Sequence, residues 1–189
     1  MPPSTETRAT LDDLLAFDGN GELIQGRIVK LMPTGRRSGV IALEIAFSLR
    51  GHVRATGRGL ALGDGVGFAV PELASGRESF SPDASYYDGP PSANPMRFIE
   101  GPPTFAVEVR SEFDAGPAAL REMAAKRADY FEAGTLAVWD VDPLAELVHA
   151  YRREEPGVAR TFARGQVADA EPAVPGWAMA VDEVFGPAI

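Results

Sequence analysis

Cysteine is absent from the 189-residue sequence, and histidine occurs only at His52 and His149. The lack of cysteine excludes disulfides, iron–sulfur clusters, thiolate-bound zinc and a cysteine nucleophile. A metal site built from several histidines is also excluded, and a Ser-His-Asp triad would have to use one of these two residues. Several common kinds of catalytic and metal centre are therefore closed to this chain.

Excess positive charge and long apolar runs are missing as well. The net charge is −9 and the pI is about 4.7. This charge argues against a protein that mainly coats DNA or an acidic membrane surface, although a nuclease with a small basic groove remains open. No run of 18 apolar residues occurs, and the first residues, MPPSTETRATLDD, lack the apolar core of a signal peptide. We therefore expect no membrane partner and a cytoplasmic location.

The composition that remains is that of a globular protein, with 45% hydrophobic and 24% charged residues. The length predicts one domain over residues 1–189. Within it we expect residues 1–8 to form a loose N-terminal tail. Residues 153–189 are expected to form a C-terminal extension packed on the core.

Hydrophobic periodicity and turn residues predict an alternation of helices and strands. The elements are a short helix after Thr10, a strand pair within 22–32, a long helix over 38–56, a strand or hairpin over 60–70, a short strand within 81–88, an exposed connection over 90–103, a strand over 104–110, a helix between Pro117 and Gly134, a strand over 135–142, an antiparallel return strand after Pro143, and short β-like pieces from 157 onward that include WAMAVDEVF. This order predicts an α/β (or α+β) fold with one central mixed sheet.

The familiar nucleotide and metal motifs fail. No Gly-Lys pair exists, so a P-loop is excluded. The glycines at 63–67 have the wrong spacing for a dinucleotide loop and are followed by Phe-Ala-Val-Pro instead of a helix, which favours a β-turn. H-E-x-x-H, an EF-hand loop and G-x-S-x-G are also missing.

Three charged residues form the most suggestive set: Asp83 at the start of a short strand, Glu108 near the end of an apolar strand, and Lys126 in the following helix. Two carboxylates on neighbouring strands would supply hard oxygen ligands for Mg²⁺. The metal would polarise a phosphoryl oxygen and lower the pKa of a bound water. A lysine beside them would hold or help deprotonate that water and stabilise developing negative charge. These are the parts of a metal-dependent phosphodiesterase.

Strand alternation gives Glu108 a defined side. Phe105, Val107 and Val109 share one face of their strand, whereas Glu108 shares the other face with Arg110. A carboxylate in a buried strand requires a metal, a cation or a hydrogen bond. The spacing alone leaves a second interpretation open. In it the aspartate belongs to a surface turn, the glutamate pairs with Arg110 or the helix lysine, and that lysine is solvated.

The order of several segments resembles the Uma-two family of restriction-endonuclease-like proteins, within the PD-(D/E)XK nuclease superfamily. The resemblance runs from about residue 10 to about residue 152. Its segments are TLDDLLAF, GELIQGRIVKLMPTG, FSPDASYYD, FAVEVRS and REMAAKRADYFEAGTLAVWDVDP. The run K-x-x-x-Y-x-x-x-G ahead of V-W-x-V-D-P is the most telling part.

This resemblance implies a restriction-endonuclease-like core, with a central mixed sheet flanked by helices, in a homodimer that acts on DNA with Mg²⁺ or Mn²⁺. Asp83 and Glu108 would be the catalytic carboxylates and metal ligands. Lys126 would be the catalytic lysine, shifted from strand to helix. The backbone carbonyl of Val109 would be a further ligand. Glu22 would be either an additional metal ligand or a residue that supports the site.

Two positions depart from the pattern. Arg110 stands where the short superfamily motif has its lysine, and it would either neutralise Glu108 or contact phosphate. An always-charged guanidinium is a poor proton-transfer group, which favours Lys126 for catalysis. Many family members have a histidine where this chain has Arg36, Arg37, Ser38 and Gly39. The two arginines are candidates for phosphate contact, with a solvated loop as the alternative.

The leading functional hypothesis is a divalent-metal-dependent endonuclease that hydrolyses DNA phosphodiester bonds. The second is a catalytically silent nuclease-fold module for dimerisation or partner binding, which the negative net charge favours. The third is a metal-dependent hydrolase with a substrate smaller than DNA.

Overall fold

The computed structural model describes residues 8–112, 114 and 116–187, so most of the predicted N-terminal tail lies outside the described residues. The elements are α1 (Leu11–Leu15), β1 (Gly21–Ile24), β2 (Arg27–Lys30), α2 (Arg36–Thr56), β3 (Leu60–Gly63), β4 (Phe68–Ala69), β5 (Ser79–Phe80), β6 (Ala84–Tyr87), β7 (Ile99–Glu100), β8 (Phe105–Val109), α3 (Pro117–Ala133), β9 (Ala137–Asp142), β10 (Leu147–Arg152), β11 (Glu155–Phe162), β12 (Val167–Asp169), β13 (Ala178–Ala180) and α4 (Val181–Phe185).

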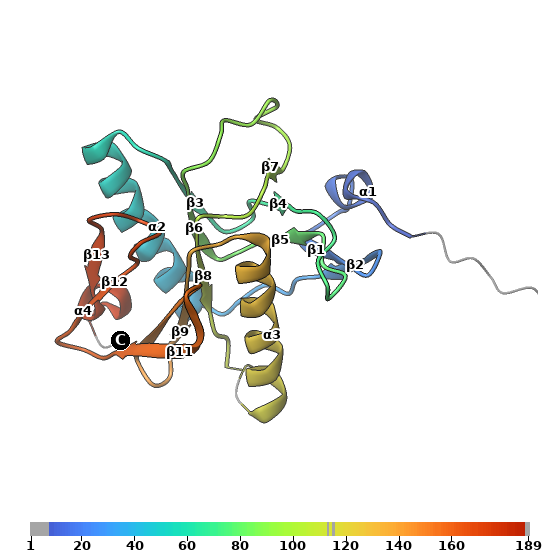
Figure 1. Cartoon of the computed structure of the whole chain (residues 1–189). Helices are drawn as coiled ribbons and strands as arrows, with labels where there is room; N and C mark the ends of the chain where they lie inside the picture. The colour runs from blue at the N-terminus through green and yellow to red at the C-terminus, as the bar shows by residue number, and fades with distance from the viewer. Residues whose placement is uncertain (1–7, 113, 115, 188–189) are drawn as a thin grey trace, which may run out of the picture.

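A six-stranded sheet with the order β11-β10-β9-β8-β6-β3 forms the centre of the molecule. Its two middle strands, β8 and β9, are parallel, and the other neighbouring pairs are antiparallel. The α3 crossover joins the parallel pair, as a parallel connection requires. Figure 1 shows α2 and α3 on opposite sides of this sheet. The predicted fold class, a central mixed sheet flanked by helices, is confirmed.

One face of the sheet packs against α2 and the C-terminal elements. Phe105, Val107 and Val109 point to this side, as the strand alternation predicts, and join a core with Trp139 and Trp177. The two indole rings lie 5.0 Å apart between centroids. The C-terminal segment thus contributes buried side chains to the same core as β8.

The other face packs against α3 and the small N-terminal sheets. Ala106 and Val138 point to this side and contact a cluster that includes Phe80, Tyr130 and Phe131. The rings of Phe80 and Tyr130 stack at a centroid distance of 4.1 Å. Glu108 lies on this α3 face, so its carboxylate is separated from the larger apolar core.

The N-terminal elements add a hairpin and a small sheet beside α3. Thr10 caps α1 through a reciprocal capping box with Asp13. β1 and β2 form an antiparallel hairpin that turns at Gln25, whose φ is 52°, and Gly26, whose φ is 69°. β4 pairs with β5 and β7 in a separate three-stranded sheet. Glu22 lies in this hairpin, and Arg77 lies in the loop before β5, beside β1.

One sequence prediction is wrong at the C-terminal end. The stretch WAMAVDEVF was expected to be β-like throughout, but only Ala178–Ala180 pair as β13, and Val181–Phe185 form α4. Asp182 and Glu183 occupy the first turn of this helix, where carboxylates are favourable, and Val184 is buried. A five-residue helix is too short for its period to be separated from strand alternation. Among the described helices, none is long and apolar enough to cross a membrane.

Candidate active site

Asp83 and Glu108 come together across β6 and β8. Ala84 pairs with Val107 in this antiparallel ladder. Asp83, one residue before Ala84, therefore lies opposite Glu108, one residue after Val107. The amide of Asp83 donates to the carbonyl of Val107 at 3.0 Å. The predicted pair of carboxylates on neighbouring strands is therefore present at one end of the sheet.

The Asp83 carboxylate is held by the backbone of β8. Its Oδ2 accepts a hydrogen bond from the amide of Val109 at 2.6 Å. Burial and, after it, the nearby charge of Glu108 raise the pKa of Asp83 to about 7. No described cation pairs with Asp83 closely enough to form a salt bridge. Asp83 is thus held by a backbone amide, without a salt bridge to a described side chain.

Glu108 is anchored from α3 through one oxygen. Its Oε1 lies 2.8 Å from Nζ of Lys126 and accepts a hydrogen bond from the Tyr130 hydroxyl at 2.7 Å. Burial raises the pKa of Glu108, with Lys126 opposing the rise and Glu22 adding to it. Tyr130 stays a neutral donor, because burial and Glu108 raise the pKa of its phenol.

Lys126 bridges two carboxylates. Its Nζ lies 2.8 Å from Glu108 Oε1 and 3.0 Å from Glu22 Oε1. Burial alone would lower the pKa of the ammonium group, but Glu108 and Glu22 raise it above its ordinary value. Lys126 is thus held beside Glu108 as a protonated cation, although the loop after β8 and the first part of α3 separate the two residues in the sequence.

Glu22 is committed to contacts within the protein. It is only 3% exposed. Its Oε1 faces Lys126 and accepts from the amide of Ser81 at 3.0 Å, while its Oε2 accepts from Nη1 of Arg77. Burial would raise the pKa of Glu22, but these cations and the amide together lower it. Both oxygens are therefore used to hold neighbouring groups.

The donor set suits a cation that keeps much of its water. Within the described part of the chain, no group of three or more His, Cys, Asp or Glu side chains is placed to hold a metal ion. Two carboxylates and a backbone carbonyl would leave further coordination positions to water, which is how Mg²⁺ is usually bound. Burial raises the pKa of both carboxylates, and Lys126 offsets this rise only in part. A divalent cation would favour the ionised form of both carboxylates, so the residues present fit Mg²⁺ or Mn²⁺.

The three arginines predicted to bind substrate differ in the partners of their guanidinium groups. Arg110 donates from Nε and Nη2 to Asp140 at 2.7 and 2.9 Å, and from Nη1 to Asp142 at 2.9 Å. It therefore neutralises these aspartates and not Glu108. Arg37 pairs with Glu146 at 2.5 Å, and Arg36 is exposed at the start of α2. The carbonyl of Arg110 accepts from Ser38 Oγ at 2.9 Å, which ties this end of α2 to the end of β8.

Three residues that hold the site residues in place were not predicted from the sequence. Tyr130 is a buried core aromatic, and no role in the site was predicted for it, but its hydroxyl donates to Glu108. Arg77 and Asp129 were not singled out, although they pair at 2.8 Å beside Glu22. Their separations in sequence carry no recognisable pattern, because the contacts join a loop, a hairpin and a helix. The one available signal is that Asp129 and Tyr130 follow Lys126 by three and four residues, so each lies near Lys126 on the helix surface.

Comparisons with known proteins agree with this fold. A family model, Uma2, described as "Putative restriction endonuclease", matches residues 11–182. The solved structure of "a putative nuclease" from Anabaena variabilis is similar, with a TM-score of 0.71 and 19% sequence identity, over 93% of this chain and 97% of that one. At this identity the structural likeness shows the fold alone. No curated protein matches the chain.

Proposed function

Since the chain belongs to the Uma2 family, described as "Putative restriction endonuclease", we propose that it is a divalent-metal-dependent nuclease that hydrolyses DNA phosphodiester bonds. The observation that carries this proposal is the juxtaposition of Asp83 with Glu108, which Lys126 contacts at 2.8 Å. Two acidic oxygens and a fixed cation are the parts that phosphodiester hydrolysis requires.

Mg²⁺ or Mn²⁺ would be held by the carboxylates of Asp83 and Glu108 and the backbone carbonyl of Val109. Bound there, the ion would neutralise phosphate charge and lower the pKa of a coordinated water. The Val109 amide fixes one oxygen of Asp83, and Lys126 with Tyr130 fixes one oxygen of Glu108. The protein thereby orients both ligands before the ion arrives.

Lys126 acts as a cation in this proposal and not as a base. Glu108 and Glu22 raise the pKa of its ammonium group, so it keeps its proton at neutral pH. In this form it would orient the attacking water by hydrogen bonding and stabilise negative charge on the phosphoryl oxygens. The proton of the water must then leave to solvent or to a substrate oxygen.

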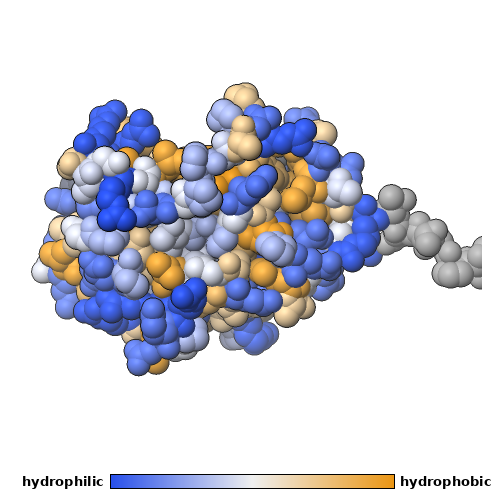
Figure 2. Space-filling view, turned by 45° about the horizontal axis from the view of Figure 1, so that its top comes forward, coloured by the Kyte–Doolittle hydropathy of each residue, from blue (hydrophilic) through white to orange (hydrophobic). Residues whose placement is uncertain are grey.

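Contact with the DNA backbone is assigned to Arg36 and Arg37, which begin α2. Arg36 is exposed, and Arg37 is 52% exposed despite its ion pair with Glu146. Arg110 is the weaker candidate, because its donors are used by Asp140 and Asp142. Figure 2 shows polar residues covering most of the viewed face, with apolar residues gathered in patches among them.

The proposal is tested by incubating the protein with supercoiled plasmid, single-stranded circular DNA and bis(p-nitrophenyl) phosphate. Each substrate is assayed with Mg²⁺, with Mn²⁺ and with EDTA. Metal-dependent cleavage of either DNA is the expected result. Hydrolysis of the small diester without DNA cleavage would favour the hydrolase of smaller substrates. Metal binding without any cleavage would favour the catalytically silent module.

We also propose that the protein forms a homodimer through the exposed face of α2. Val40, Leu43 and Phe47 are 43%, 53% and 64% exposed and recur at helical spacing. If two copies of α2 pack antiparallel about Phe47, Glu44 of one copy faces Arg50 of the other, since each lies three residues from the centre. Such self-complementarity is what a two-fold interface requires.

Sedimentation velocity tests this interface. We expect a dimer for the wild type and for Leu144→Glu, a control at a residue that is 69% exposed elsewhere on the surface. Phe47→Glu should be a monomer with an unchanged circular dichroism spectrum. A monomeric wild type, or a dimer that persists in Phe47→Glu, would contradict the proposal.

A further inference from the structure

Arg77 and Asp129 form a buried ion pair beside the candidate site. Arg77 is 7% exposed and so is Asp129. Nε of Arg77 donates to Oδ2 of Asp129 at 2.8 Å, and Nη1 contacts Oε2 of Glu22. Neither residue contacts Asp83 or Glu108 through a described hydrogen bond or salt bridge. Their link to the site therefore runs through Glu22.

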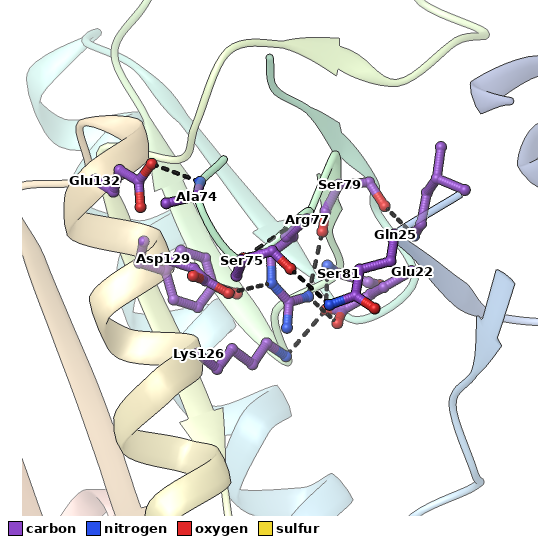
Figure 3. Close-up of polar contacts among 12 residues, drawn as sticks. Glu22, Gln25, Ala74, Ser75, Arg77, Ser79, Ser81, Lys126, Asp129 and Glu132 are labelled. Atoms are coloured by element: carbon purple, nitrogen blue, oxygen red, sulfur yellow. Dashed lines mark hydrogen bonds and ion pairs between the residues drawn. The ribbon is translucent and has the colours of Figure 1, made fainter. Parts of the chain in front are cut away.

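These contacts close a ring. Glu22 binds Arg77 through Oε2 and Lys126 through Oε1. Lys126 and Asp129 are three residues apart on α3 and so lie on one face of the helix. Figure 3 shows Lys126 and Asp129 projecting from α3 toward Glu22 and Arg77. The ring joins the β1 hairpin, the loop before β5 and α3.

The backbone holds Arg77 and Glu22 in fixed relation to each other. Arg77 forms an isolated bridge with Ile24, and the amide of Glu78 donates to the carbonyl of Leu23 at 2.8 Å. The amide of Gln25 donates to Gly76 at 2.6 Å. The segment that carries Arg77 thus runs beside β1, and only the side chains reach across to α3.

Charge explains why the ring matters for Lys126. Glu22 offers one oxygen to each of two cations, so its attraction is divided between Arg77 and Lys126. Lys126 in turn is shared between Glu22 and Glu108, at 3.0 and 2.8 Å. Without Arg77, the whole charge of Glu22 would act on Lys126 and Asp129 would lose its partner. The ammonium group would then be drawn toward Glu22 and away from Glu108.

We propose that Arg77, tied to Asp129 on α3, is a positioning residue that holds Glu22 and thereby keeps the Lys126 ammonium group at Glu108. The inference rests on the proposed nuclease function for its catalytic consequence. Its structural part, the placement of Lys126, can be measured without catalysis.

The sequence offers a direct probe, because its lysines are Lys30 and Lys126 alone. Selective labelling with ¹³C- and ¹⁵N-lysine therefore gives two sets of side-chain signals. Lys30 is exposed at the end of β2 and is the internal control. In Arg77→Met we expect the Cε and Nζ signals of Lys126 to shift while those of Lys30 stay in place. Arg58→Met, which removes a surface ion pair with Asp88, should move neither set.

Arg77→Met also leaves the buried carboxylates of Glu22 and Asp129 without their arginine partner, which can prevent folding. Arg77→Lys keeps a cation at Glu22 but loses the planar second contact to Asp129, and it carries the same test with a smaller displacement of the Lys126 signals. Lys126 signals that are unchanged in a folded Arg77 variant would overturn the proposal.

Cleavage kinetics with Mn²⁺ supply the second readout. We expect kcat to fall by about tenfold or more in an Arg77 variant, with KM changed by less than about threefold, because a displaced cation harms the reaction more than binding. A loss confined to KM would contradict a positioning role. If the wild type cleaves no DNA while the Lys126 signals still shift, the proposed function fails and the positioning claim stands.

Discussion

At the scale of single residues, Asp83 gives the stability of the metal-free protein a distinctive pH dependence. Its pKa is raised from 3.8 to about 7 in the folded protein. Between these values the folded chain keeps a proton that the unfolded chain has lost, so stability falls as pH rises through this interval and levels off above it. The slope is about 1.4 kcal/mol per pH unit at most.

Urea denaturation in EDTA at several pH values measures this effect. Asp83→Asn cannot titrate, so the stability difference between it and the wild type should grow in favour of the variant from pH 4 to about pH 7. Two parallel pH profiles would show that Asp83 keeps an ordinary pKa in the folded protein.

Lys126 gives a second prediction at this scale, in which metal binding and catalysis change in opposite directions. Its ammonium group lies 2.8 Å from Glu108 and repels a cation bound there. Lys126→Met should therefore bind Mn²⁺ more tightly, by on the order of tenfold, while DNA cleavage is lost. Asp83→Asn should weaken Mn²⁺ binding instead. Titration calorimetry with Mn²⁺ makes this comparison, and a Lys126→Met variant that loses affinity as Asp83→Asn does would refute it.

At the scale of elements, the glycine cap at the C-terminal end of α3 helps to stabilise the helix that carries Lys126, Asp129 and Tyr130. Gly134 ends this helix with φ at 116°, a conformation that costs a residue with a side chain about 1–2 kcal/mol. Gly134→Ala should lower the free energy of unfolding by that amount.

Gly51 is the matched control for this substitution. It lies inside α2, and a Cβ there would meet no heavy atom within 4 Å. Gly51→Ala should raise stability by about 0.5–1 kcal/mol, because alanine favours helix. Urea melts of both variants check the pair, and a change of the same sign in both would contradict the assignment of Gly134 to a left-handed cap.

Most of these elements could be predicted from local sequence. The capping residue Thr10, the apolar stripe of α2, and the Pro117 and Gly134 boundaries of α3 are signals within a few residues of the element they define. The α4 helix could not be predicted in the same way, because five residues are compatible with either period. Its helical form depends on the packing of Val184 and Phe185 into the shared core.

At the scale of the whole molecule, the candidate site depends on long-range contacts. The resemblance identified Asp83, Glu108 and Lys126, which the fold brings into one cluster. Arg77 lies 52 positions from Asp129 and 55 from Glu22, and no local pattern connects them. Pairing of buried charges is visible only once three separate segments are placed beside one another. The sequence thus pointed to the three charged residues and to Glu22, but not to Arg77 and Asp129, which pair beside Glu22.

If Asp83, Glu108 and Lys126 form one metal-dependent nuclease site, a cleavage assay of variants at these residues should show it. Wild type, Asp83→Ala, Lys126→Ala and the surface control Arg58→Met are purified in parallel and incubated with single- and double-stranded DNA in Mg²⁺ or Mn²⁺. We predict cleavage by the wild type and Arg58→Met, with a loss of at least about a hundredfold in the two site variants. Equal cleavage by all four proteins would reveal a contaminating nuclease and contradict the assignment of this site.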